Sequence, residues 1–165
     1  MRHDFTPDAA AIRAFLARAA EKYTQQHSAL PRKFPLVTRV DVAFLVGTPS
    51  VPVLYVDFDT RPGAELDGDA THRCFAELQL PQWERVMRPE RNEVLIATMP
   101  DGSEQQADDD GIDRLLGRVL VEAFKAAAGG GAFDTLPMTP DCDFGITYEG
   151  CPLWSSRQGD NIPED

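Results

Sequence analysis

Four side chains in the sequence are of the types that commonly bind zinc: His72, Cys74, Cys142 and Cys151. Structural zinc sites bring their ligands in pairs that are about two to four residues apart. Eight residues separate Cys142 from Cys151, so these two do not form such a pair. The three cysteines are also an odd number without a pairing motif. The sequence therefore predicts no metal and no cofactor, and reduced thiols rather than a disulfide framework.

Acidic residues gather in one stretch whose oxygen atoms are of the type that calcium prefers: Asp57, Asp59, Glu65, Asp67 and Asp69. Calcium loops alternate their ligands and place a glycine at the sixth position. Counted from Asp57 or from Asp67, that position holds Pro62 or His72. The pattern favours a solvated acidic loop over a calcium site.

Covalent catalysis would need a nucleophile beside a base, and the chain has three histidines for the second role: His3, His27 and His72. Cys74 is the nucleophile nearest to His72 in sequence, but residues two apart on a helix do not face each other.

The glycine run 129–131 follows an expected helix, whereas phosphate-binding loops precede one. No motif identifies a reaction, so we expect no enzyme. A hydrolase or metal-dependent enzyme that uses the loop at 57–69 remains an alternative.

Charge is distributed unevenly along the chain. Sixteen Lys and Arg residues face 27 Asp and Glu residues, for a net charge of −11. Residues 1–56 carry seven basic and four acidic side chains, whereas residues 57–165 carry nine and 23. A surface of one sign attracts partners of the opposite sign and repels phosphate backbones. The sequence thus argues against nucleic acid and favours a basic protein as the partner.

Acidic side chains at expected turns and two tryptophans are the candidate partner-binding residues. The acids are those of the 57–69 loop together with Asp108, Asp109 and Asp110. Trp83 and Trp154 lie among polar neighbours, and interfaces favour tryptophan anchors. The alternative for each tryptophan is that it covers the edge of the core. If the loop acids contact a basic partner, replacing them should slow its association and weaken the dependence of that rate on salt.

Hydrophobic spacing and turn residues predict the secondary structure of the first half. Pro52 confines the strand that contains it to a sheet edge or to a first position. Along that strand, Tyr55 and Asp57 point one way while Leu54 and Val56 point the other. In order, the expected elements are a helix, an antiparallel hairpin, a loop and two short helices: residues 8–26, 36–46 with 51–58, 59–70, 71–78 and 81–87.

The second half contains the strongest apolar stripe at helical spacing. This stripe includes Leu116, Leu120 and Phe124, which we expect in the core together with Phe15 and Leu16 of the first helix. Carboxylates at 108–110 suit the start of this helix, and the glycine run stops it. The other expected elements are a hairpin with a polar edge strand, a last short strand and a tail: residues 93–99 with 103–107, 144–148 and 155–165.

These elements predict an α+β fold in one domain, with an antiparallel sheet packed against about three helices. The domain is expected over residues 1–154, followed by a flexible acidic tail over 155–165. Apolar runs are far shorter than the roughly 20 residues of a membrane helix. The start of the chain lacks the apolar segment of a signal peptide. We therefore expect a soluble, cytoplasmic protein.

In size, acidity and element order, the chain resembles the small acidic α+β immunity proteins that bacteria make against polymorphic and contact-dependent toxins. The amphipathic first helix, the segment from Leu78 to Trp83 before a hairpin, and the absence of a catalytic set carry this resemblance. It implies a cytoplasmic protein that captures and neutralises a toxin or effector domain, often a basic nuclease. A regulatory or oligomerising domain without a small ligand is a further alternative.

Overall fold

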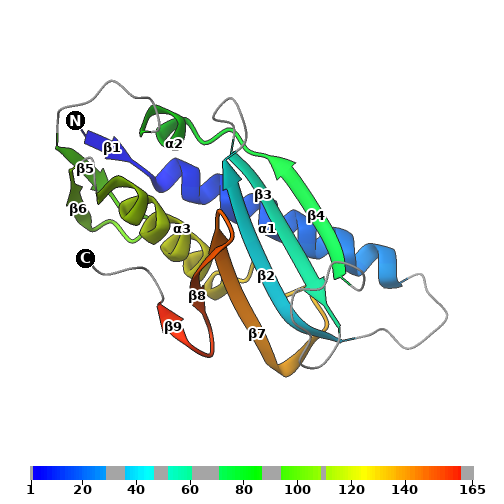
Figure 1. Cartoon of the computed structure of the whole chain (residues 1–165). Helices are drawn as coiled ribbons and strands as arrows, with labels where there is room; N and C mark the ends of the chain where they lie inside the picture. The colour runs from blue at the N-terminus through cyan, green and yellow to red at the C-terminus, as the bar shows by residue number, and fades with distance from the viewer. Residues whose placement is uncertain are drawn as a thin grey trace.

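The computed structural model describes residues 2–28, 36–46, 52–60, 71–86, 94–108 and 111–160. These residues form three helices and nine strands in the order β1, α1, β2, β3, β4, α2, β5, β6, α3, β7, β8, β9 (Figure 1). The α+β fold in a single domain with three helices, predicted from the sequence, is confirmed.

Six strands form the larger sheet, in the spatial order β4-β3-β2-β7-β8-β9. Neighbouring strands are antiparallel except for β2 and β7, which run parallel. The hairpin of β2 and β3 confirms the expected one, and Pro52 occupies the first position of β3. The strands are β2 Val37–Val46, β3 Pro52–Asp59, β4 Thr71–Glu77, β7 Met138–Tyr148, β8 Cys151–Ser155 and β9 Gly159–Asp160.

A second sheet has three strands: β1 Arg2–Asp4, β5 Leu95–Thr98 and β6 Glu104–Ala107. Their spatial order is β1-β5-β6, with β1 parallel to β5 and β5 antiparallel to β6. A tight turn joins β5 to β6, in which the Gly102 amide donates to the Met99 carbonyl at 2.9 Å. Gly102 has a φ of +86°, which favours glycine. The polar strand β6 is an edge strand, as its composition predicts.

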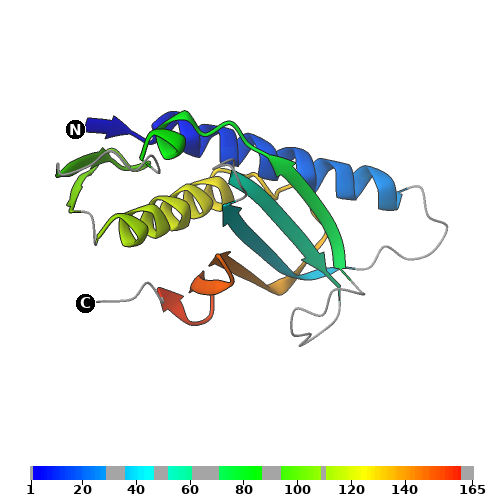
Figure 2. The same cartoon turned by 45° about the horizontal axis from the view of Figure 1, so that its top comes forward.

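The helices are α1 Thr6–Ser28, α2 Pro81–Val86 and α3 Ile112–Gly129. The two long helices lie beside each other on one face of the six-stranded sheet, as Figures 1 and 2 show. Tyr23 of α1 contacts Phe58 of β3 with ring centroids 5.1 Å apart, and Phe124 of α3 contacts Phe144 of β7 at 6.2 Å. The core therefore lies between this pair of helices and one sheet face.

Amphipathic periodicity predicts the core well. Phe15 and Leu16 of α1 are buried, and so are Leu116, Leu120 and Phe124 of α3. Helix α1 begins two residues earlier than expected, and the Asp4 carboxylate ahead of it accepts the Thr6 amide at 2.9 Å. Beyond α3, the Gly130 amide closes the last turn on the Ala126 carbonyl at 2.9 Å.

The prediction of a short helix over residues 71–78 is wrong, because Thr71–Glu77 forms strand β4. This strand pairs with β3 residue by residue, from Thr71 opposite Asp59 to Glu77 opposite Val53. Helical propensity over so few residues is a weak preference, and the pairing of a whole strand outweighs it. The short helix expected next is confirmed as α2.

Residues 138–160 form more strand than the sequence indicates. The strand expected over 144–148 extends over the eleven residues of β7. Ser155 belongs to β8, and Gly159–Asp160 pairs with it as β9 after a turn, so residues 155–160 complete a hairpin at the edge of the sheet instead of a tail. Residues 161–165 lie outside the described part of the chain. The sheets are also mixed, not purely antiparallel, because β2 and β7 run parallel in the larger sheet and β1 and β5 run parallel in the smaller one.

Among the residues that the structure describes, no helix combines the length and the hydrophobicity that are needed to cross a membrane.

Candidate functional site

The face of the six-stranded sheet opposite α1 and α3 carries the candidate site, and we call it the open face. Strand side chains alternate between the two faces, so the buried Val40, Val42 and Phe44 of β2 point to the helices. Their neighbours along the chain point to the open face. Register then assigns the rest of this face from β3 and β7: Val53, Tyr55, Asp57, Asp59, Asp143, Gly145 and Thr147.

Charged residues occupy one end of the open face. Arg39 lies between Asp59 of β3 and Asp143 of β7, and in the next row Asp41 lies between Asp57 and Gly145. Asp41, Asp57 and Asp59 are buried, with 6%, 5% and 3% of their surfaces exposed. Carboxylates from three adjacent strands, Asp41, Asp59 and Asp143, thus lie around the Arg39 guanidinium, with Asp57 in the next row, and among the four only Asp143 is partly exposed.

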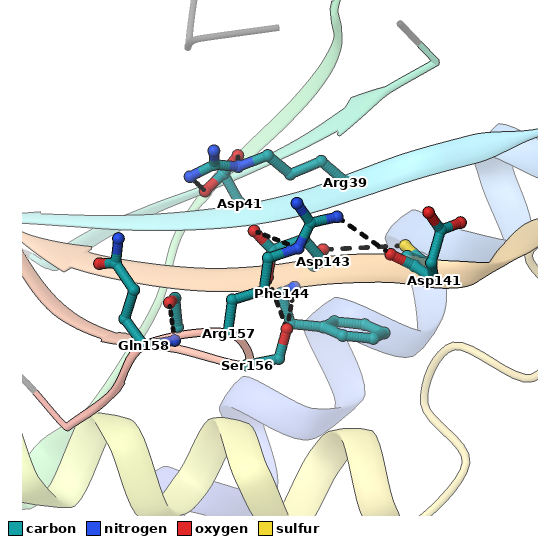
Figure 3. Close-up of polar contacts among 10 residues, drawn as sticks. Arg39, Asp41, Asp141, Asp143, Phe144, Ser156, Arg157 and Gln158 are labelled. Atoms are coloured by element: carbon teal, nitrogen blue, oxygen red, sulfur yellow. Dashed lines mark hydrogen bonds and ion pairs between the residues drawn. The ribbon is translucent and has the colours of Figure 1, made fainter. Parts of the chain in front are cut away.

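The Arg39 guanidinium and the Asp41 carboxylate form a two-point ion pair (Figure 3). Nη2 donates to Oδ1 at 2.9 Å, and Nε lies 2.5 Å from Oδ2. The pKa of Arg39 is raised because Asp41 accepts its hydrogen bond, although burial acts in the opposite direction. Burial raises the pKa of Asp41, because its desolvation outweighs the hydrogen bond and the charge of Arg39. The ion pair holds both side chains in place on β2, an inner strand of the sheet.

Gly145 allows the Asp41 carboxylate to approach β7 closely. A Cβ atom at position 145 would lie 2.5 Å from Asp41 Oδ1, which is inside van der Waals contact. A glycine is therefore required on β7 directly opposite Asp41 if the ion pair is to keep its geometry.

A second polar network joins β7 to the turn after β8. The Ser156 hydroxyl donates to Asp143 Oδ1 at 2.5 Å and accepts the Phe144 amide at 2.9 Å. Arg157 donates to the Asp141 carbonyl at 3.3 Å, and its Nε lies 3.6 Å from Asp143 Oδ2 (Figure 3). The carboxylate of Asp143 is therefore held in place from both sides, and Asp141 beside it is exposed.

Apolar and aromatic side chains occupy the other end of the open face. Leu45 is 37% exposed, and Ala43, Val53 and Tyr55 are half-buried beside it. In the register, Tyr55 lies opposite Ala43 and Val53 opposite Leu45. Exposed apolar residues that border polar groups are typical of surfaces that bind other proteins.

The residues expected to bind a partner do not come together in one place. Asp57 and Asp59 lie on the open face but are almost inaccessible. Asp108 lies elsewhere, after β6, where its carboxylate accepts the Gly111 amide at 3.1 Å ahead of α3. The other expected acids lie outside the described residues: Glu65, Asp67, Asp69, Asp109 and Asp110.

Neither tryptophan is presented to solvent as an anchor. Trp83 is 1% exposed and contacts Phe44 and Tyr148, with ring centroids 4.6 and 6.0 Å away, so it belongs to the core. Trp154 of β8 is half-buried on the helix side, where its ring lies 5.8 Å from Phe124. The Lys125 ammonium lies 5.6 Å from the Trp154 ring centroid. Both tryptophans therefore fit the alternative stated for them in the sequence analysis, in which each ring covers the edge of the core.

Arg39, Asp41 and Asp143 were not among the candidate residues from the sequence. The sequence does contain a signal for Arg39 and Asp41, because they are two residues apart within an expected strand and must therefore share a face of the sheet. Asp143 has no such signal, since its place beside Arg39 follows from pairing between strands about 100 residues apart in sequence.

Metal-ligating and nucleophilic side chains lie apart from one another in the described part of the chain. Among them, no group of three His, Cys, Asp or Glu side chains is arranged to hold a metal ion. The three cysteines are free: Cys74 is buried, Cys142 is half-buried and Cys151 is exposed. Burial, and after it the charges of Asp143 and Asp141, raise the pKa of Cys142 to about 11, which disfavours its reactive thiolate.

Comparison with protein-family models, with curated proteins and with solved structures yields no match for this chain.

Proposed function

We propose that the protein is a binding protein that captures a basic protein partner on its open face. The observation that carries the proposal is the composition of this face, which the described helices leave uncovered. Carboxylates from β2, β3 and β7 lie at one end, and an apolar end with Leu45 and Tyr55 lies at the other. Apolar contact area supplies affinity, whereas complementary charge supplies orientation and a fast encounter.

The carboxylates have two different roles in this proposal. Asp141 and Asp143 are accessible enough to meet lysine or arginine side chains of the partner directly. Asp57 and Asp59 are too buried for direct contact and already interact within the protein, so they are not assigned to the partner. The net charge of −11 then accelerates the encounter with a basic molecule, and salt weakens that effect.

A toxin or effector domain is the partner we propose, in keeping with the resemblance to bacterial immunity proteins. The protein would neutralise it by covering its basic surface. For the alternatives, Ser156 hydrogen-bonds to Asp143 and Phe144, and within the described part of the chain neither a histidine nor a lysine joins this pair, so no observation favours a hydrolase. A regulatory or oligomerising domain remains as an outcome of the test below.

The test takes the domain encoded by the gene next to that of this protein and asks first whether its production arrests the growth of cells. Co-expression of the wild-type protein should restore growth. Leu45→Arg should not, because it places a cation on the apolar end of the open face against a basic partner. Val94→Arg is the matched control, since Val94 is an exposed aliphatic residue that precedes β5 in the other sheet.

Binding kinetics with the purified domain give the quantitative result. We expect Leu45→Arg to weaken affinity at least about tenfold, which is about 1.4 kcal/mol, and Val94→Arg to leave it unchanged. The association rate of the wild-type protein should fall steeply as salt increases. Equal binding by both variants, or a rate that is indifferent to salt, would refute capture by the open face. Self-association alone, without an effector, would favour the oligomerising domain.

A further inference from the structure

Arg157 lies in the turn between β8 and β9, where it contacts the charged end of the open face (Figure 3). Its Nε lies 3.6 Å from Asp143 Oδ2, and its Nη2 donates to the Asp141 carbonyl at 3.3 Å. One carboxylate oxygen and one backbone oxygen of β7 thus hold a guanidinium between them, and we call these two acceptors the arginine site. The protein already binds an arginine side chain there, and that arginine is its own.

The arginine site is positioned by the sheet and not by Arg157. The Ser156 hydroxyl donates to Asp143 Oδ1 at 2.5 Å, so the carboxylate is held through the oxygen that Arg157 does not contact. The Phe144 amide donates to that hydroxyl at 2.9 Å and fixes it in turn. The other acceptor, the Asp141 oxygen, belongs to the backbone of β7. Both acceptors would therefore keep their places if the Arg157 side chain moved away.

The Arg157 side chain itself is loosely held. It is 63% exposed, whereas the Asp143 side chain that it contacts is 12% exposed. Both of its contacts are longer than the about 2.7–2.9 Å of strong charged hydrogen bonds. Exposed ion pairs contribute little to stability, because solvent screens the charges and the side chains lose conformational freedom. Another guanidinium can therefore replace that of Arg157 at small cost, and the departure of Arg157 opens one side of the Asp143 carboxylate.

The two acceptors suit arginine better than lysine. A guanidinium is planar and carries five donors in a rigid fork, so one arginine can donate to two oxygens at once, whereas the lysine ammonium is a compact point charge. Arg39 does not take this role from an incoming arginine, because its own fork is engaged by both carboxylate oxygens of Asp41. The chemistry of the site thus specifies a guanidinium that approaches from outside the sheet.

We propose that the arginine site binds an arginine side chain of the partner, and that Arg157 occupies the site in the free protein and is displaced on binding. This inference rests on the function proposed for the open face and names the group that the partner brings to it. Since one arginine replaces another, the exchange contributes selectivity more than affinity. A basic partner is favoured when it presents a guanidinium to the same two oxygens, and Arg157 keeps Asp143 paired until then.

The site is tested first with N-acetylarginine amide, followed by the NMR shifts of the Phe144 and Ser156 backbone amides at constant salt. Arg157→Ala vacates the site, so the probe should bind this variant at least about threefold more tightly than the wild-type protein, in which Arg157 competes. The N-acetylcitrulline amide has nearly the same shape without the charge and should not bind. Arg18→Ala removes the same charge from the exposed side of α1 and should behave as the wild-type protein does. Arg157→Lys keeps the charge without the fork and should give an intermediate affinity.

The domain of the growth test then shows whether the partner uses the site. Arg157→Ala should tighten its binding by about threefold, and Asp143→Asn should weaken it. In the Asp143→Asn background, Arg157→Ala should have no further effect, because the oxygen for which the two arginines compete has lost its charge. A general effect of surface charge would persist in that background and would contradict the exchange.

The inference is overturned if N-acetylarginine amide leaves the Phe144 and Ser156 amides of the Arg157→Ala protein unshifted, if it binds the wild-type protein equally well, or if the citrulline amide binds as tightly. It is also overturned if the domain binds and responds to Leu45→Arg but is indifferent to Arg157→Ala. If the domain does not bind the wild-type protein at all, the proposed function fails, and N-acetylarginine amide still decides whether the arginine site exists.

Discussion

Replacing Asp8 should change how the stability of the protein depends on pH. Asp8 lies on α1, but its buried carboxylate contacts the start of α2, a helix far from Asp8 in sequence. Asp8 belongs to α1 and is 1% exposed. It accepts the Trp83 amide at 2.9 Å and the Gln82 amide at 3.4 Å, both in the first turn of α2. The side chain thus caps α2 from outside and holds Trp83 in the core.

The pKa of Asp8 is raised, chiefly because burial penalises the charged form more than the amides of Trp83 and Gln82 favour it. The folded state therefore binds this proton more tightly than the unfolded state does. The stability that results is fully present below the unfolded pKa of about 3.9, and it is lost as pH rises through the folded pKa. Asparagine cannot ionise, so Asp8→Asn removes this dependence and keeps an oxygen that can accept the Trp83 amide.

Two substitutions separate the charge from the hydrogen bonds. Asp8→Ala leaves the Trp83 amide buried without its acceptor and weakens the start of α2, at a cost of about 2–4 kcal/mol. Asp8→Asn should cost about 1 kcal/mol or less near pH 4 and should become more favourable, relative to the wild-type protein, as the pH rises. The free energy of unfolding, measured by urea denaturation from about pH 4 to about pH 8, gives both values.

Asp4 is the matched control, because its environment shifts the pKa in the opposite direction. This exposed carboxylate accepts the Thr6 amide, which lowers its pKa. The contribution of Asp4 to stability is present above the unfolded pKa and is lost as pH falls. The Asp4→Asn protein should therefore become less stable relative to the wild-type protein as the pH rises. The reasoning on Asp8 fails if the difference between wild-type and Asp8→Asn proteins is flat over this range, or changes in the wild-type protein's favour as pH rises.

Three further predictions concern packing, the open face and the thiols. Leu116→Ala removes a fully buried side chain of α3 and should lower the free energy of unfolding by about 2–5 kcal/mol, whereas Leu45→Ala at an exposed position should cost less than about 1 kcal/mol in the same denaturation experiment. Gly145→Ala brings a methyl group onto the Asp41 carboxylate and should cost about 1–3 kcal/mol; an unchanged unfolding midpoint would contradict the close approach. Iodoacetamide should label the exposed Cys151 of the native protein first, and mass spectrometry after partial reaction should find the other two thiols mostly unmodified.

Local sequence patterns determine the elements whose partners are close in the chain. The apolar stripes of α1 and α3 repeat with the period of a helix, and the side chains of those stripes form the core. The hairpins β2–β3 and β5–β6 are equally readable, because a turn and alternating residues specify both strands and their register. The edge position of β6 follows from its polar composition. In each of these cases the information lies within a few tens of residues.

Only the tertiary structure decides the pairings between distant segments. Residues 71–77 become a strand because β3 offers them an edge, and β7 joins β2 in parallel only after α3 has crossed the sheet. The same pairing places Asp143 beside Arg39 and Gly145 beside Asp41, so the charged end of the open face does not exist before the sheet is assembled. Trp83 is buried because α2 packs on the core, although its immediate neighbours in sequence are polar.

The physical reason is that register in a sheet is a collective property. Shifting β7 by one residue along β2 would move all its side chains to the opposite face, exposing Phe144 and Ile146 and burying Asp143 against the helices. The cost of burying that charge and exposing those apolar groups selects a single register. No short stretch of sequence contains this information, since it arises from the fit of β7 to β2 and to both long helices at once.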